Sequence, residues 1–157
     1  MIFLTDLGLL GHEGEVPDDD AFVVPLGQAA VHRNGDDVTF VSYAKTVGVC
    51  LEAAQVLGDR GISAEVIDLR TLKPLDEAIV LASLRHTGRL VIVHEASGLC
   101  GMAAELAALA AGKAFDALRA PVVRLTGPDA PAASSWALEQ AAVPRADALV
   151  EAVLGLM

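Results

Sequence analysis

The chain has 157 residues, which suits one full domain with a substantial core. Its 21 acidic residues outnumber its 11 basic residues, so we expect no nucleic-acid partner and no anionic-membrane surface, because both depend on clustered Lys and Arg. The two cysteines, Cys50 and Cys100, lie far apart without a C-x-x-C motif. This spacing argues against a disulfide framework or a zinc site and favours a reduced, cytoplasmic setting.

The first twenty residues differ in character from the rest of the chain. Residues 2–4 predict a short apolar strand, which runs into Gly8 and Gly11 and then into an acidic link that contains Pro17. Two interpretations stay open. The segment is either an ordered N-terminal arm or the last piece of an upstream domain followed by its linker.

Two β-prone runs follow, residues 28–33 and 38–43, with Asn34 and Gly35 between them. Asn-Gly between such runs is the strongest short signal for a β-hairpin. We therefore predict that the first run is an antiparallel edge strand paired with the second.

From there the chain alternates apolar runs with segments of helical spacing. The predicted strands are residues 38–43, 64–69, 90–93 and 121–125. The predicted helices are residues 45–61, with Gly61 as the C-terminal stop, and residues 74–84, 102–115, 136–142 and 146–157. Strands that alternate with helices imply right-handed crossovers, so we predict an α/β fold, a three-layer α/β/α domain.

The strongest site candidate lies at the end of the run that spans residues 90–93, which is typical of a buried parallel strand. Ligands gather at the carboxyl ends of such strands, where His94 and Glu95 follow. These neighbours point to opposite faces and cannot form a proton relay alone, so each needs another partner or simply closes the strand. Gly98 and Gly101 then either present N–H groups to an anion or make a tight turn into the next helix.

Two further candidates come from the rest of the chain. Asp129 lies in a loop stiffened by two prolines at another strand end, so we expect it at the same edge of the sheet. Trp136 is either a packing residue or an anchor for a partner. Cys50 and Cys100 are expected to be buried small hydrophobes rather than nucleophiles. The residues alone contain no nucleophile with its base, no metal constellation and no full phosphate cradle.

Six segments, taken together, resemble the C-terminal, transketolase-C-like domain of the β subunit of 2-oxo acid dehydrogenase E1 components. They are VPLGQAAVHRNGDDVTFVSYA, EVIDLRTLKPLD, GRLVIVHEA, CGMAAELA, VVRLTGPDAPAA and ALEQAAVPRADALVEAV. The likeness covers residues 24–157, whereas residues 1–23 resemble the end of an upstream pyrimidine-binding domain and its linker. The resemblance implies a five-stranded, mostly parallel sheet with an antiparallel first strand.

For function, the resemblance implies thiamine-diphosphate-dependent oxidative decarboxylation of pyruvate or a branched-chain 2-oxo acid, with acyl transfer to the lipoyl group of a dihydrolipoyl acyltransferase, E2. It implies that thiamine diphosphate and Mg belong to the complete enzyme and that this chain alone binds neither and is inactive. The domain would instead contact a second β subunit, the E1 α subunit and the E2 docking domain.

Acidic residues near the C-terminus, including Glu139, Asp147 and Glu151, would steer a basic docking domain or serve solubility only. The alternative function is a free-standing α/β/α ligand-binding or scaffold module. Such a module would use the same sheet edge to hold a nucleotide or another partner.

Overall fold

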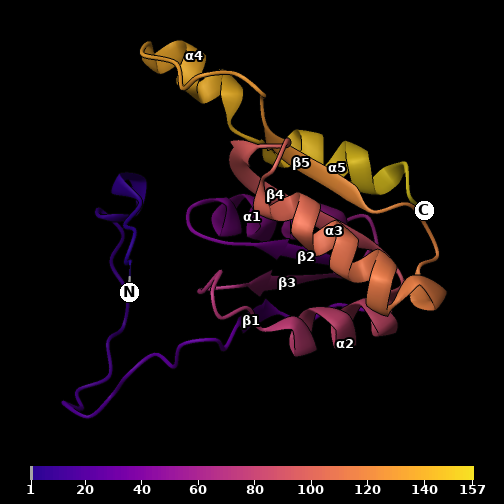
Figure 1. The fold of residues 1–157 in the computed structure, drawn as a ribbon, viewed down its shortest axis with the longest axis horizontal. Helices are drawn as coiled ribbons and strands as arrows, with labels where there is room; N and C mark the ends of the chain where they lie inside the picture. The colour runs from indigo at the N-terminus through magenta and orange to yellow at the C-terminus, as the bar shows by residue number, and fades with distance from the viewer. Residues whose placement is uncertain (1) are drawn as a thin grey trace.

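The computed structural model describes residues 2–157 and contains a five-stranded sheet between two helical layers (Figure 1). The strands are β1 (Ala30–Arg33), β2 (Val38–Ser42), β3 (Ala64–Asp68), β4 (Leu90–Ser97) and β5 (Val123–Gly127). The α-helices are α1 (Thr46–Gly58), α2 (Glu77–Thr87), α3 (Met102–Lys113), α4 (Trp136–Ala142) and α5 (Ala146–Leu154). Short 3-10 helices cover Leu7–Leu9 and Phe115–Ala117.

The sheet has the order β1-β3-β2-β4-β5. Strand β1 runs antiparallel to β3, and every other pair of neighbours is parallel. The predicted α/β/α class is therefore confirmed, together with the five strands and the antiparallel first strand that the resemblance implied.

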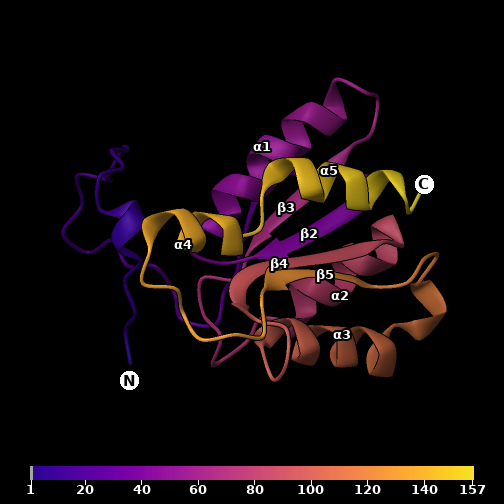
Figure 2. The same cartoon turned by 90° about the horizontal axis from the view of Figure 1, so that it is seen from above.

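Each central strand contributes side chains to two cores, because successive residues of a strand point to opposite faces. Phe40 and Val91 pack in the core formed with α1 and α5. Val41 and Ile92 pack in the core formed with α2 and α3. Figure 2 shows these two helical layers on opposite sides of the sheet. The same alternation determines which helical layer each side chain near the end of a strand faces.

The predicted hairpin around Asn34 and Gly35 is wrong. Strand β1 is an antiparallel edge strand, as expected, but its partner is β3, which lies between β1 and β2. The turn passes across the start of β3, where the Asp37 amide donates to the Ser63 carbonyl at 2.8 Å. Gly35 allows this close crossing, since a Cβ there would lie 2.7 Å from the Ala64 carbonyl oxygen. Strand β1 therefore pairs with β3 and not with β2, the partner that the Asn-Gly signal predicted.

The strand predicted at residues 2–4 is also wrong. Ile2, Phe3 and Leu4 are each 86% exposed, and the first regular element is the 3-10 helix Leu7–Leu9. A strand needs a neighbour for its backbone groups, and none lies beside this segment within the described part of the chain. Met1, the residue before the predicted strand, lies outside the described residues. Figure 1 shows the arm leaving the body of the domain.

Helix α2 and strand β4 fix the approach to the candidate site. The Asp76 side chain accepts from the Ile79 amide at the start of α2, and Gly88 ends this helix with a left-handed φ of 75°. Strand β4 then runs to Ser97, four residues beyond the predicted end at residue 93. His94 and Glu95 consequently lie within the strand instead of after it.

Candidate functional site at the carboxyl ends of the central strands

His94 points into the layer of α2 and α3, like Ile92 two residues before it. Its side chain is fully buried, and Nε2 accepts a hydrogen bond from the Ala103 amide at 3.0 Å. Burial is the main cause that lowers the pKa of His94 below its usual value. The Tyr43 ring stacks on the imidazole with 5.7 Å between the centroids. His94 therefore serves the first turn of α3 and is shielded from solvent.

Glu95 points the other way, as the strand period requires, and forms an ion pair of 2.5 Å with Lys45. The hydrogen bond with Glu95 is the main cause that raises the pKa of Lys45, and the carboxylates of Asp6 and Glu139 add to it. The pKa of Tyr43 is raised by burial first and by the Glu95 charge second. Lys45 is thus the cation that pairs with β4 through Glu95.

The turn from β4 into α3 depends on two glycines. A Cβ at Gly101 would lie 2.9 Å from His94 Cε1 and closer still to the Ser97 carbonyl oxygen. A Cβ at Gly98 would lie 2.9 Å from Thr126 Oγ1. The tight-turn interpretation of these glycines accounts for both contacts, because each glycine lets another segment approach its backbone.

Asp129 holds this turn from the loop after β5. Its carboxylate accepts from the Ser97 hydroxyl and from the Leu99 amide, the second at 3.0 Å. The Ser97 hydrogen bond is the main cause that lowers the pKa of Asp129. Arg124 of β5 donates to the Gly98 carbonyl at 3.2 Å. The loop expected at the same edge does lie there and binds the turn.

The cysteines differ from each other. Cys50 is buried as expected, and burial raises the pKa of its thiol to about 12. Cys100 was expected to be buried and is exposed. It occupies the turn before α3 with a φ of 56°.

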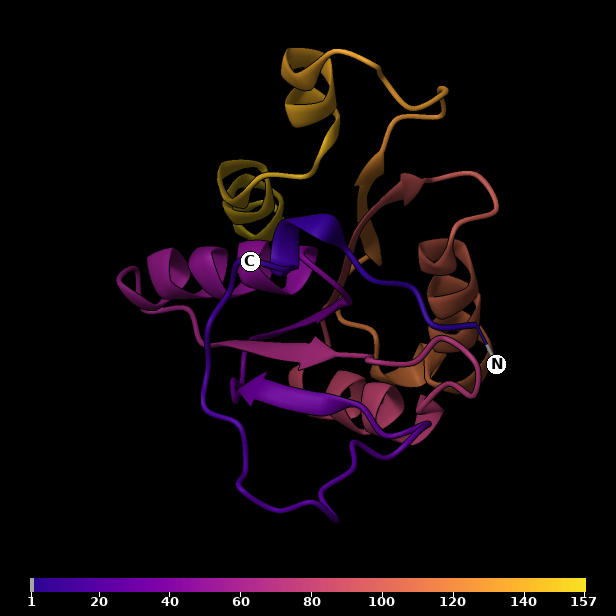
Figure 3. The same ribbon diagram turned by 90° about the vertical axis from the view of Figure 1, so that its left-hand side faces the viewer.

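Trp136, Asp147 and Glu151 lie apart from this turn, on α4 and α5. The packing interpretation of Trp136 is wrong, because its side chain is 75% exposed and α4 buries no residue. Figure 3 shows α4 projecting beyond the layer of α1 and α5. The tryptophan is therefore free to contact another molecule.

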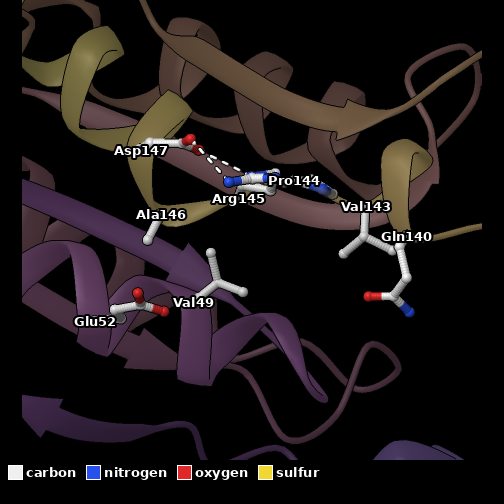
Figure 4. Close-up of a pocket in the computed structure, with 8 residues that line it drawn as sticks. All are labelled: Val49, Glu52, Gln140, Val143, Pro144, Arg145, Ala146 and Asp147. Carbon is white, nitrogen blue, oxygen red and sulfur yellow. Dashed lines mark hydrogen bonds and ion pairs between the residues drawn. The ribbon is translucent and has the colours of Figure 1, made fainter. Parts of the chain in front are cut away.

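Asp147 and Glu151 lie along a groove between α1 and α5. The groove consists of two adjoining hollows of about 350 and 470 Å³, and Glu52 and Asp147 line both. Arg145 pairs with Asp147 at 3.2 Å (Figure 4). The Ala148 amide, and after it Arg145, lowers the pKa of Asp147. Three carboxylates, two of them expected from the sequence, thus share this groove with Arg60 and Arg145.

Sequence reasoning missed Tyr43, Lys45, Arg124 and Glu52. Tyr43 and Lys45 follow β2, so the rule that ligands gather at carboxyl ends of parallel strands, which selected His94, could have selected them too. Arg124 carried a weaker signal, a single cation in an apolar strand. Glu52 carried none, because an acidic residue on a helix is ordinary.

Within residues 2–157, no group of three or more His, Cys, Asp or Glu side chains could hold a metal ion. None of the described helices is both long enough and apolar enough to cross a membrane.

Comparison with known proteins places the fold. The model of the transketolase C-terminal domain matches residues 27–149. The beta subunit of acetoin:2,6-dichlorophenolindophenol oxidoreductase from Bacillus subtilis is 43% identical over 100% of this chain and 46% of its own length. The pyruvate dehydrogenase E1 beta-1 subunit from Arabidopsis thaliana is 41% identical over 97% of this chain and 43% of its own length. The chain thus spans about half the length of the curated relatives it matches.

Two solved structures are also similar to this chain. A split-gene transketolase, an inactive beta4 tetramer, has a TM-score of 0.75 and 30% identity over 86% of this chain and 44% of its own. A 2-oxoglutarate:ferredoxin oxidoreductase from Magnetococcus marinus has a TM-score of 0.56 at 14% identity, over 82% of this chain and 19% of its own, and shares the fold. Because the family model covers most of the sequence, the chain belongs to the family of transketolase C-terminal domains.

Proposed function

We propose that this chain is the C-terminal domain of the β subunit of a thiamine-diphosphate-dependent E1 oxidoreductase of the 2-oxo acid dehydrogenase type. The observation that carries the proposal is the alignment of 97–100% of the chain with such β subunits at 41–43% identity. Residues 1–23 would then be the end of the upstream pyrimidine-binding domain and its linker, and residues 24–157 the domain itself. The exposed thiol of Cys100 supports a cytoplasmic location.

The domain's role would be assembly rather than chemistry. At the end of β4, His94 is buried against α3 and Glu95 is held by Lys45, so neither is poised as a free acid or base. The exposed Trp136 and Leu99 offer apolar anchors for a second β subunit or the α subunit. Thiamine diphosphate and Mg²⁺ would be held in the complete enzyme by residues outside this chain.

The substrate of the complete enzyme would be a small 2-oxo or 2-hydroxyketone compound. The names of the relatives divide between acetoin and pyruvate at 43–44% and 40–44% identity, so identity favours neither. The assay should therefore offer pyruvate, a branched-chain 2-oxo acid and acetoin.

The test uses the full β subunit that contains this chain, purified with its α subunit. We expect thiamine-dependent reduction of 2,6-dichlorophenolindophenol with at least one of these substrates. Deletion of residues 24–157 should abolish both assembly in sedimentation and dye reduction. A truncated subunit that still assembles and reduces the dye would overturn the proposal. A chain that stays monomeric and does not bind the α subunit would favour the free-standing module instead.

The groove between α1 and α5, where three carboxylates outnumber two arginines, supports docking of a basic E2 domain. Asp147 and Glu151 line it with Glu52, and opposite charges on two partners accelerate their encounter. Reversal of Asp147 and Glu151 to Lys should slow association with the E2 docking domain, and the loss should shrink as salt screens the field.

A matched control changes the net charge equally at a different place. Glu105→Lys with Asp116→Lys reverses two exposed acidic residues in α3 and the 3-10 helix that follows it, in the opposite layer. An equal loss of rate in both double variants would mean that only total charge matters. An unchanged rate for the Asp147 and Glu151 reversals at low salt would remove these residues from the docking surface.

A further inference from the structure

The first turn of α3 obtains its capping acceptor from the sheet. The amides at the start of a helix have no acceptor within the helix, and a side chain at the N-cap position usually supplies one. Here the N-cap is Gly101, which has no side chain and no room for a Cβ. Nε2 of His94 takes this place and accepts from the Ala103 amide at 3.0 Å.

This hydrogen bond fixes the protonation of the ring. A nitrogen that accepts carries no proton, so the neutral imidazole must carry its proton on Nδ1. Nδ1 is itself buried without a hydrogen-bond partner in the described part of the chain. A second proton can therefore go only to Nε2. The Nε2–H group would then face the Ala103 N–H group, and because both are donors the hydrogen bond between them would be lost. The second proton would also put a positive charge at the positive end of the α3 dipole.

The surroundings of the ring oppose that second proton. No carboxylate of residues 2–157 forms a hydrogen bond with the ring. Burial lowers the pKa of His94 most, the backbone of Ala96 acts in the opposite direction, and the charge of Arg124 lowers the pKa further. Tyr43, which stacks on the ring, has a raised pKa and stays neutral.

The remaining charged groups are engaged elsewhere. Glu95 lies on the other face of β4 in its pair with Lys45. Asp129 binds Ser97 and Leu99 across the turn. Glu105 is exposed in the first turn of α3.

We propose that His94 is an acid-sensitive latch: the neutral ring holds the turn from β4 into α3 closed through Ala103, and a proton on Nε2 releases it. The released segment would be residues 98–103, which carry the exposed Leu99 and Cys100. Asp129 would still tether the turn at Leu99, so the change would be local opening and not unfolding. The layer of α1 and α5 lies across the sheet and would not respond. All the residues of the latch lie in this chain, so the proposal does not depend on the proposed function.

The sign of the pH effect follows from the lowered pKa. A histidine whose pKa is lower when the turn is closed binds more protons when it is open, so acid favours the open state. The effect begins as the pH falls below the ordinary value of 6.5 and continues down to the lowered value. Above about pH 7 the ring is neutral in both states and the closed turn has its full stability.

The experiment is hydrogen exchange of the whole chain, followed by mass spectrometry of peptides that cover residues 98–106. After correction for the intrinsic effect of pH, exchange there should be about tenfold faster at about pH 5 than at about pH 7.5, the factor that corresponds to one net hydrogen bond. In His94→Gln the amide oxygen can accept from Ala103 but does not titrate, so this increase should vanish. His86→Gln, at an exposed histidine paired with Asp36, should keep it.

A second measurement covers the case in which His94→Gln does not fold. Nitrogen NMR of the ring in the unaltered chain at about pH 7.5 should show the proton on Nδ1. A proton on Nε2 would overturn the proposal. The same holds for an acceleration in acid that is equal in the unaltered chain and in His94→Gln.

Discussion

The crossing of the turn before β2 over the start of β3 can be tested at Gly35. A Cβ placed there would lie 2.7 Å from the Ala64 carbonyl oxygen and closer still to the Ala64 carbonyl carbon and the Glu65 nitrogen. All three neighbours are backbone atoms of β3, a strand with partners on both sides. Gly35→Ala must therefore move the turn or the strand, because no side chain can swing away.

The size of the effect follows from that geometry. Overpacking in a well-packed region costs about 1–3 kcal/mol, and a clash with backbone belongs at the upper end, so we expect a loss of about 3 kcal/mol in the free energy of unfolding. For a chain of this length, about 2–4 °C of melting temperature correspond to 1 kcal/mol, so the melting temperature should fall by about 10 °C. Thermal and urea unfolding followed by circular dichroism measure both quantities.

Gly48→Ala is the matched control. Gly48 lies within α1, and a Cβ there would meet nothing within 4 Å. Alanine is a better helix former than glycine, so this variant should gain about 1 kcal/mol. If Gly35→Ala were as stable as the unaltered chain while Gly48→Ala gained stability, the crossing over β3 would be refuted.

Three further results are expected. Cys100 should react with a thiol reagent in the native chain, whereas Cys50, with its pKa near 12, should react only after unfolding, as mass spectrometry of the labelled chain would show; rapid native labelling of both would contradict this burial. Asp129→Ala should accelerate hydrogen exchange at the Leu99 amide, which donates to this carboxylate. In the unaltered chain the hydrogen bond should persist as the pH falls to 3.8, the ordinary pKa of the carboxyl group, and should weaken only below pH 3.8. The reason is that a lowered pKa stabilises the folded form above the ordinary value. Trp136→Ala should change the free energy of unfolding by less than about 0.5 kcal/mol, because the side chain is mostly exposed, and a larger loss in urea unfolding would mean that it packs after all.

The alternation of strands and helices could be predicted because its signals are local. The apolar run that became β4 and the helical spacing that became α1 each depend on residues close in sequence. The partner of β1 depends on β3, more than thirty residues away, and the Asn-Gly signal contains no information about that competitor. Pairing between distant strands is therefore where local reasoning failed.

In the candidate site, too, features set by nearby residues could be predicted and features set by distant segments could not. The opposite directions of His94 and Glu95 could be predicted from the strand period alone. The bond from Ala103 to His94 could not, because it depends on how closely α3 returns to β4 after the glycine turn. The exposure of Cys100 and Trp136 was missed for a related reason, since residue type indicates average burial and not the position of a turn or a projecting helix.

The two outer strands of the sheet, β1 and β5, bear on aggregation. An outer strand with a free row of backbone groups invites a strand from another molecule to add to it. Strand β1 is four residues long, carries His32 and Arg33 and has an irregular register against β3; β5 is five residues long and carries Arg124. Shortness, charge and irregular register all discourage such addition, so this sheet is built to resist growing into a fibril from either side.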